Sequence, residues 1–266
     1  MNKNFIIGRY VSGNSIIHQL DSRAKLLAGF CFIALLMLAN SWQFYLIMIL
    51  YTLLILKLTR ISFVYYYKGL KPLIKLIIFT VMLQILFSGG GTIYFSFGPI
   101  TISQLGISRS VVVFLRFVLS IVMMAAISLT TKPIDLIDAF ELILSPLKIV
   151  KAPVQDLSLM LGIALRFVPT LIDEATRVMK AQQSRGVDFD EGNVSKRMKK
   201  LLPIFLPLYI SSFYRAEELA NTLDVRGYLG YKKRTKLRIQ KWHCRDTVFL
   251  MSYLILTSLL VIFSRS

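Results

Sequence analysis

The chain has 266 residues, of which 55% are hydrophobic and only 17% charged, and it carries a formal net charge of +18. Its mean hydropathy is +0.63. These values exclude an intrinsically disordered chain and an ordinary water-soluble domain. Because about 20 mostly apolar helical residues cross a bilayer, the composition predicts an integral membrane protein, and its basic residues must first be examined as topology signals.

Five apolar stretches are long enough, or nearly so, to be predicted as transmembrane helices. They cover residues 26–39, 42–56, 73–87, 107–129 and 247–263. The first two stretches are short, and they can alternatively form one tight hairpin that turns at residues 40–41. The fold class expected from this pattern is an all-α polytopic membrane protein with about five transmembrane helices.

The distribution of Lys and Arg predicts the orientation. With a cytoplasmic N-terminus, 29 of the 32 basic residues fall on the cytoplasmic side, whereas the long outer loop of residues 88–106 has none. Cytoplasmic loops carry an excess of basic residues, so we expect the N-terminus inside and the C-terminus outside. Arg116 lies nine residues into the fourth predicted span, and no predicted span contains an acidic residue. We expect its side chain to snorkel outward or to bond carbonyls and polar groups of a neighbouring helix.

Residues 132–246 differ in kind from the rest, because they hold 13 of the 14 acidic residues. They are predicted to form a cytoplasmic helical domain between a membrane segment of residues 1–131 and a last transmembrane helix within 247–266. Pro133 suits the first turn of a helix, and Ser145-Pro146 is expected to end or kink that helix.

Two apolar stretches in this domain, residues 157–168 and 201–214, are better suited in length to interfacial or buried helices than to spans. Pro169 is expected to stop the first, and the second contains Pro203 and Pro207. Both are predicted to lie at the cytoplasmic face, partly sunk into the membrane or beneath a partner.

Beyond each apolar stretch the chain is predicted to continue as a long amphipathic helix, because apolar residues recur with helical periodicity. The two apolar faces comprise Leu171, Ile172, Ala175, Val178 and Met179 in the first helix, and Tyr209, Phe213, Ala216, Ala220 and Leu223 in the second.

The two helices are expected to end in similar tripeptides, Ser184-Arg185-Gly186 and Val225-Arg226-Gly227. Glycine is the favoured cap after a helix end, and a cation in the last turn complements the helix dipole, so one such ending is explained by structure alone. Two endings, 41 residues apart on two long cytoplasmic helices, favour a docking role. The rigid donor fork of arginine suits an acidic or carbonyl-lined socket.

With these motifs the sequence resembles the EcfT family, the transmembrane subunits of energy-coupling factor transporters. Arg185-Gly186 and Arg226-Gly227 match the X-Arg-Gly motifs that end the family's two coupling helices, although Ser184 and Val225 depart from the alanine form. The family's opening segment is matched by Gly8-Arg9-Tyr10, Ser15, His18, Leu20-Asp21-Ser22-Arg23 and Lys25, with Ser22 where proline is common.

This resemblance implies a coupling scaffold in the bacterial cell membrane, placed between two cytoplasmic ABC ATPase subunits of the EcfA type and one small integral membrane S component. The S component would capture a vitamin or related micronutrient, while ATP and Mg would be bound by the ATPases, with no cofactor or metal in this chain. The ATPase-coupling residues implied are Ser184, Arg185, Gly186, Val225, Arg226 and Gly227. Contact with the S component is predicted for Leu157, Leu161, Phe205 and Leu206.

Two other function classes fit the sequence less well. A permease subunit of another ABC importer also couples to ATPases, but it typically uses a single coupling segment. An intramembrane enzyme needs ionisable groups at membrane depth or at its edge, whereas the predicted spans contain no acid and no histidine. The chain also lacks a P-loop sequence, so it is not expected to hydrolyse ATP.

Two polar features receive structural interpretations. His18 and Asp21 are predicted to cap a helix or order a loop rather than to act in catalysis. The basic run that includes Lys232-Lys233-Arg234 and Lys241 is predicted to contact anionic lipid headgroups rather than nucleic acid.

Overall fold

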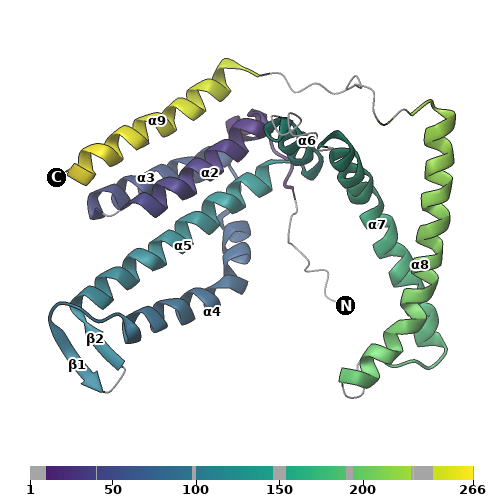
Figure 1. Ribbon diagram of the computed structural model, residues 1–266, viewed down its shortest axis with the longest axis horizontal. Coiled ribbons are helices and arrows are strands. Elements are labelled where there is room, and N and C mark those ends of the chain that lie inside the picture. The colour runs from purple at the N-terminus through teal and green to yellow at the C-terminus, as the bar shows by residue number, and fades with distance from the viewer. Residues whose placement is uncertain are drawn as a thin grey trace. The chain divides into compact units, whose positions relative to one another are not determined.

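The computed structural model describes residues 10–39, 41–97, 100–145, 154–189, 194–228, 230 and 242–265. Within these ranges the chain is almost entirely helical and divides into two compact units (Figure 1). The first unit comprises Met1–Ile143 with Gln240–Ser266, and the second comprises Leu144–Ile239. The predicted all-α class is confirmed.

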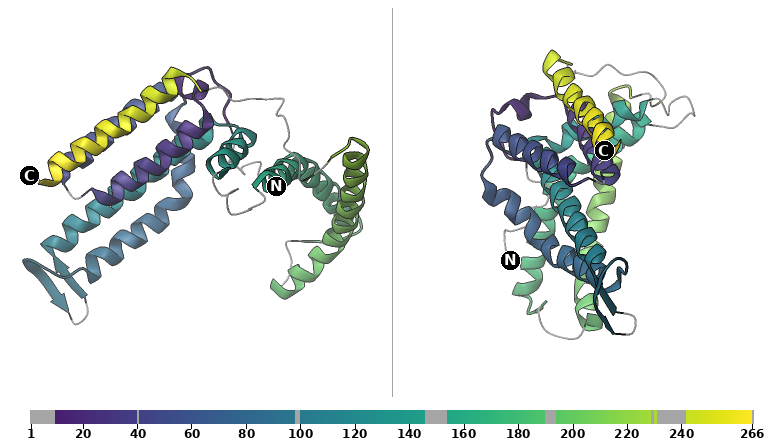
Figure 2. Two further views of the ribbon diagram at one scale, coloured as in Figure 1. Left: turned by 45° about the horizontal axis from the view of Figure 1, so that its top comes forward. Right: turned by 90° about the vertical axis from the view of Figure 1, so that its left-hand side faces the viewer.

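The first unit is a layer of long helices in which α2 and α5 are central. Its helices are α1 (Ile16–Gln19), α2 (Ser22–Leu38), α3 (Trp42–Thr59), α4 (Phe63–Phe87), α5 (Gln104–Thr130), α6 (Pro133–Ile143) and α9 (Cys244–Arg265). Helix α2 packs against α5, α6 and α9, and α5 also packs against α3 and α4 (Figure 2). Gly29 permits the close approach of α2 to α5, because a Cβ there would lie 2.8 Å from Ile127 Cδ1.

The predicted outer loop contains a short antiparallel hairpin that sequence analysis did not anticipate, formed by β1 (Ile93–Phe97) and β2 (Ile100–Ser103). Ser103 joins the hairpin to the helices on both sides. Its Oγ donates to the Ser88 carbonyl at 2.8 Å and accepts from the Gly106 amide at 3.0 Å, which caps α5. A Cβ at Gly106 would lie 2.6 Å from the Ser88 oxygen. The end of α4 and the start of α5 are therefore held too closely for any larger residue.

The second unit is formed by two long helices that pack on one another, α7 (Val154–Ser184) and α8 (Val194–Val225). The expectation that Pro169 stops the first helix is wrong, because α7 continues through it. Proline removes one backbone donor, but the amphipathic pattern on both sides still favours helix. Helix α8 likewise contains Pro203 and Pro207 in its first half, where it is bent (Figure 1). The predicted helix from Pro133 is confirmed as α6.

In the part of the chain that the structure describes, five helices have the length and composition to cross a membrane. They are α3, α4, α5, α7 and residues Cys244–Ile262 of α9. The predicted number is matched, but the set differs, since α2 has 17 residues and α7 takes its place. Our placement of residues 157–168 at the cytoplasmic face stays a prediction, as does the orientation of the termini.

The predicted domain boundary at residue 132 is not a boundary between the compact units. Helix α6 packs against α2 within the first unit, and its Ala139 and Glu141 are buried. The boundary was drawn from membrane location rather than packing, and in that sense it also stays a prediction.

Arg116 is bonded as expected. Its Nε donates to Tyr45 Oη at 2.8 Å and its Nη2 donates to the Ala39 carbonyl at 2.9 Å. Ala39 caps the end of α2 and Tyr45 lies in the first turn of α3. The guanidinium therefore lies level with the α2–α3 turn, at an end of the helix pair rather than at its middle.

Charged side chains from several elements converge at the other end of the first unit. Asp246 at the start of α9 is only 1% exposed, and its carboxylate accepts from the amides of Asp21 and His243, each at 2.8 Å. Lys25, 2% exposed, donates from Nζ to the Thr130 carbonyl at 3.0 Å. We call Asp21, Lys25 and Asp246 the charged hub; it joins the starts of α2 and α9 to the end of α5.

The interpretation of His18 and Asp21 is confirmed. Asp21 Oδ1 accepts from the Arg23 amide at 2.9 Å and so caps α2. The His18 ring bonds Ser15 Oγ at 2.6 Å and the Val11 carbonyl at 2.9 Å, which orders the segment before α1.

We expect the charged hub to make stability depend on pH through Lys25. Burial lowers the pKa of this ammonium group to about 8, although the carboxylates of Asp135, Asp246 and Asp21 oppose the shift. Between pH 8 and the ordinary value of 10.5 the unfolded chain binds more protons than the folded one, so this group's contribution makes stability rise with pH there, by about 3 kcal/mol in total. Thermal unfolding in detergent should show a less positive pH slope for Lys25→Met than for the parent chain. Equal slopes would contradict the assignment.

Candidate functional site

The two tripeptides predicted as docking motifs end α7 and α8 in the same backbone geometry. At the end of α7, the Val187 amide donates to the Gln182 carbonyl at 3.1 Å and the Gly186 amide donates to the Gln183 carbonyl at 3.0 Å. At the end of α8, the Tyr228 amide donates to Leu223 at 3.0 Å and the Gly227 amide donates to Asp224 at 2.9 Å. Both patterns are Schellman motifs with glycine in the left-handed region. We call these two ends the Arg-Gly tips.

The side chains of the Arg-Gly tips are free to meet a partner. Ser184, Arg185, Val225 and Arg226 are all exposed, and Val225 is 90% exposed, which is unusual for a β-branched apolar residue at a helix end. Within the described residues neither Arg185 nor Arg226 donates a side-chain hydrogen bond or forms an ion pair. Helix capping therefore uses the glycines and the backbone, and it leaves both guanidinium groups unused.

The tips lie at opposite ends of the α7–α8 pair. Tyr228, just after α8, bonds Asp156 near the start of α7 at 3.4 Å. At the other end, Lys200 near the start of α8 donates to the Asp188 carbonyl just after α7. The two helices are therefore antiparallel, with one tip at each end of the pair.

One ion pair connects equivalent positions of the two helices. Arg215 of α8 donates to Glu174 of α7, and these residues are 41 positions apart, the same interval that separates Arg185 from Arg226. Each partner thus lies 11 residues before its own tip. Sequence analysis noted the 41-residue offset but missed this contact. The signal was available, since opposite charges occur at matched positions of the two helices.

A shallow groove of about 480 Å³ runs along α8 to its tip. It is lined by Tyr214, Glu217, Glu218, Asn221, Thr222, Val225 and Arg226. Two carboxylates, one exposed aliphatic side chain and the tip arginine are therefore presented together. Such a mixed surface suits a protein partner better than a small apolar ligand.

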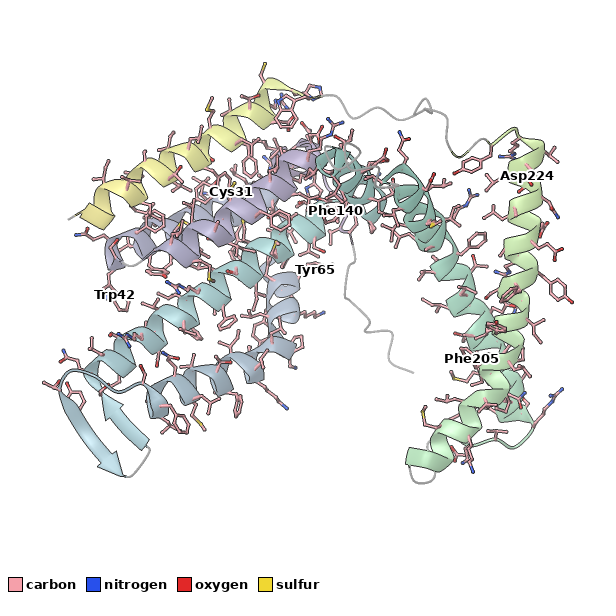
Figure 3. The ribbon with its side chains drawn as sticks, in the orientation of Figure 1. Cys31, Trp42, Tyr65, Phe140, Phe205 and Asp224 are labelled. Carbon is pink, nitrogen blue, oxygen red and sulfur yellow. The ribbon has the colours of Figure 1, made fainter. Side chains whose placement is uncertain are left out.

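The four residues predicted to contact an S component are all exposed on the second unit. Leu157 and Leu161 of α7 are each 53% exposed, and Phe205 and Leu206 of α8 are 67% and 57% exposed. Phe205 also begins an aromatic stripe with Tyr209 and Phe213, whose successive ring centroids lie 6.1 and 5.0 Å apart (Figure 3). This aromatic stripe extends the predicted apolar surface toward the middle of α8.

Some predicted features lie outside the described residues, namely Gly8, Arg9 and the basic run of residues 232–241. Across the part of the chain that is described, no cluster of His, Cys, Asp and Glu suited to a metal ion occurs.

We expect alanine at Gly186 or Gly227 to loosen the tips. Both glycines have positive φ, 85° and 70°, and a methyl group at either position would meet no atom within 4 Å, so the penalty is conformational, about 1 to 2 kcal/mol. Amide exchange of Val187 or Tyr228 should become about tenfold faster. Gly69→Ala in α4 is the control, because that glycine also has open space but no positive φ. Unchanged exchange in both tip variants would show that the caps do not restrain these ends.

Known proteins match the chain over nearly its whole length. The family model CbiQ, described as a cobalt transport protein, matches residues 13–237. The chain is 52% identical over 266 residues to the energy-coupling factor transporter transmembrane protein EcfT 1 of Listeria monocytogenes, with all of both chains covered. It is 47% identical to the EcfT protein of Lacticaseibacillus paracasei, with 97% of each chain covered, and 43% identical to that of Bacillus subtilis, with 98% of each covered.

These relatives are named as membrane subunits of transporters, which are non-catalytic components. The resemblance seen in the motifs is thereby confirmed. The chain belongs to the EcfT family and is a multi-pass transmembrane subunit of an energy-coupling factor transporter.

Proposed function

We propose that this subunit couples ATP hydrolysis by two cytoplasmic ABC ATPase subunits to the reorientation of a small S component, for uptake of a vitamin or related micronutrient. The observation that carries the proposal is the pair of Arg-Gly tips. They share one cap geometry, and each leaves an exposed arginine without a partner among the described residues.

The spacing of the tips favours two ATPase subunits rather than one. Each tip lies 11 residues from the Glu174–Arg215 contact, which is about 16 Å along a helix axis. Because the helices are antiparallel, these distances extend in opposite directions. Each tip would therefore dock in a separate socket, one on each ATPase, and the ATPases would bind the ATP and Mg.

The Glu174–Arg215 ion pair would act as the pivot of this coupling. ATP binding would draw the two ATPases together, and movement of the attached tips would change the angle between α7 and α8. The apolar surface formed by Leu157, Leu161, Phe205 and Leu206 lies on the same two helices. A change in angle would alter this surface and so the tilt of an S component resting on it.

Co-purification in mild detergent tests the proposal. We expect the tagged chain to recover two ATPase subunits and one small, strongly apolar membrane protein. Recovery of the ATPases with a second large permease would favour an ordinary ABC importer, and activity of the chain alone on a lipid would favour an intramembrane enzyme. Either result would contradict the proposal.

We expect Phe205→Asp to release the S component while the ATPases are retained. Phe205 is 67% exposed within the aromatic stripe, and a carboxylate there would be buried without a partner in the contact. Quantitative mass spectrometry of the purified complex measures the loss. Phe205→Leu keeps the surface apolar, and Asn221→Asp adds the same charge to α8 outside the stripe, so both should retain the S component. Loss of the ATPases first would show that the surface is misassigned.

A further inference from the structure

A polar cavity in the first unit lies apart from the coupling helices. Its volume is about 330 Å³, and it is lined by Ala39, Trp42, Gln84, Ser108, Arg109, Val112, Val113 and Arg116. The residues come from the α2–α3 turn, the last turns of α4 and the first half of α5. Sequence analysis treated both arginines only as exceptions to the charge distribution, and neither the proposed coupling nor the tips use them.

The two arginines share one face of α5, because seven residues correspond to about two helical turns and 10 Å of rise. Arg116 uses Nε and Nη2 for Tyr45 and Ala39, which leaves the Nη1 donors unassigned. Arg109 is exposed and, among the residues that the structure describes, forms neither a hydrogen bond nor an ion pair. Gln84 and Ser108 add neutral polar groups to the same cavity.

The chain has no acidic side chain with which to neutralise this cavity. The sequence contains no Asp or Glu between Asp21 and Asp135 and none after Asp246. Asp21 precedes α2, whereas Ala39 follows it, so the charged hub and the cavity are separated by the length of a 17-residue helix, about 25 Å. Two guanidinium groups in one partly enclosed site therefore require an anion from outside the chain.

We propose that this cavity binds the phosphodiester group of an anionic phospholipid such as phosphatidylglycerol. Arginine forks match phosphate oxygens in bidentate geometry. The depth fits a headgroup, because Arg116 lies level with the α2–α3 turn, where the short helix pair ends. Trp42, 52% exposed at the start of α3 (Figure 3), is the amphipathic residue type that accumulates at membrane interfaces. A soluble phosphate ion has the same charge chemistry but no acyl chains to follow the exposed apolar faces of α4 and α5.

Trp42 also supplies the probe. The chain has two tryptophans, so Trp242→Phe leaves Trp42 as the sole fluorophore inside the cavity. The full chain is placed in phosphatidylcholine nanodiscs that contain a small fraction of either brominated phosphatidylglycerol or brominated phosphatidylcholine. Quenching of Trp42 at equal bromine content then measures the preference for the anionic lipid.

We expect phosphatidylglycerol to be preferred by at least about fivefold, which is the effect of one basic residue near an anionic membrane surface. Arg109→Gln and Arg116→Gln should each reduce the preference about fivefold. Arg109 makes no bond within the described chain, so its variant should fold even if Arg116→Gln does not. Arg265→Gln removes a cation from the last residue of α9 and should leave the preference unchanged.

Three results would overturn the assignment. The first is equal quenching by the two brominated lipids. The second is a preference that survives Arg109→Gln, or that falls equally with Arg265→Gln, since the effect would then be general surface charge. The third is loss of the preference on adding millimolar inorganic phosphate at constant ionic strength, which would show that the site takes a free ion.

Discussion

Replacing Arg185 and Arg226 together by alanine is expected to abolish ATP-driven uptake and to release the ATPase pair while the S component remains bound. As last-turn cations these residues contribute at most about 1 kcal/mol each to helix stability, and the glycine caps at both ends do not depend on them. As docking residues in partly buried, charge-assisted contacts, each truncation should weaken ATPase binding by about 2 to 5 kcal/mol. Transport into proteoliposomes and pull-down of the ATPases measure the two effects separately.

Two further variants make this test specific to the tips. Lysine at either position should rescue poorly, because it keeps the charge but loses the planar donor fork. Arg177→Ala is the matched control, since Arg177 is an exposed arginine of the same helix about two turns before the tip. Normal uptake by the double alanine variant at equal expression would show that the arginines only complement the helix dipoles and that coupling runs elsewhere.

Asp246→Ala is expected to be the most destabilising single change in the first unit, by about 3 to 5 kcal/mol. The variant would leave the buried amides of Asp21 and His243 without their acceptor. It would also remove one of the carboxylates that attract the buried Lys25 ammonium. Unfolding of the purified chain in mixed detergent micelles, followed by circular dichroism, measures the loss.

Asp246→Asn should have a smaller effect, because the amide oxygen can still accept one of the two hydrogen bonds. Asp173→Ala removes an exposed carboxylate from α7 and should change stability by less than about 0.5 kcal/mol. A loss of similar size for Asp246→Ala and Asp173→Ala would mean that the charged hub does not hold α9 against α2.

The sequence alone determined the membrane class, the two long amphipathic helices and both Arg-Gly tips. These features rest on local signals: apolar length, helical periodicity and a glycine just past each helix end. The 41-residue offset between Arg185 and Arg226 is likewise visible without any structure. Arg116 was recognised as needing partners, because an unpaired charge within an apolar stretch is unfavourable whatever the neighbours are.

The tertiary structure decided which residues meet. Asp246 and Asp21 are 225 positions apart, and Arg116 reaches an α2 carbonyl 77 positions away, so no local pattern could predict either bond. Pro169 was given too much weight, because one lost backbone bond is outweighed by packing and pattern along a 31-residue helix. The cavity around Arg109 and the crossing at Glu174 and Arg215 exist only once helices are packed, since each is formed by side chains whose separation depends on chain folding rather than on sequence spacing.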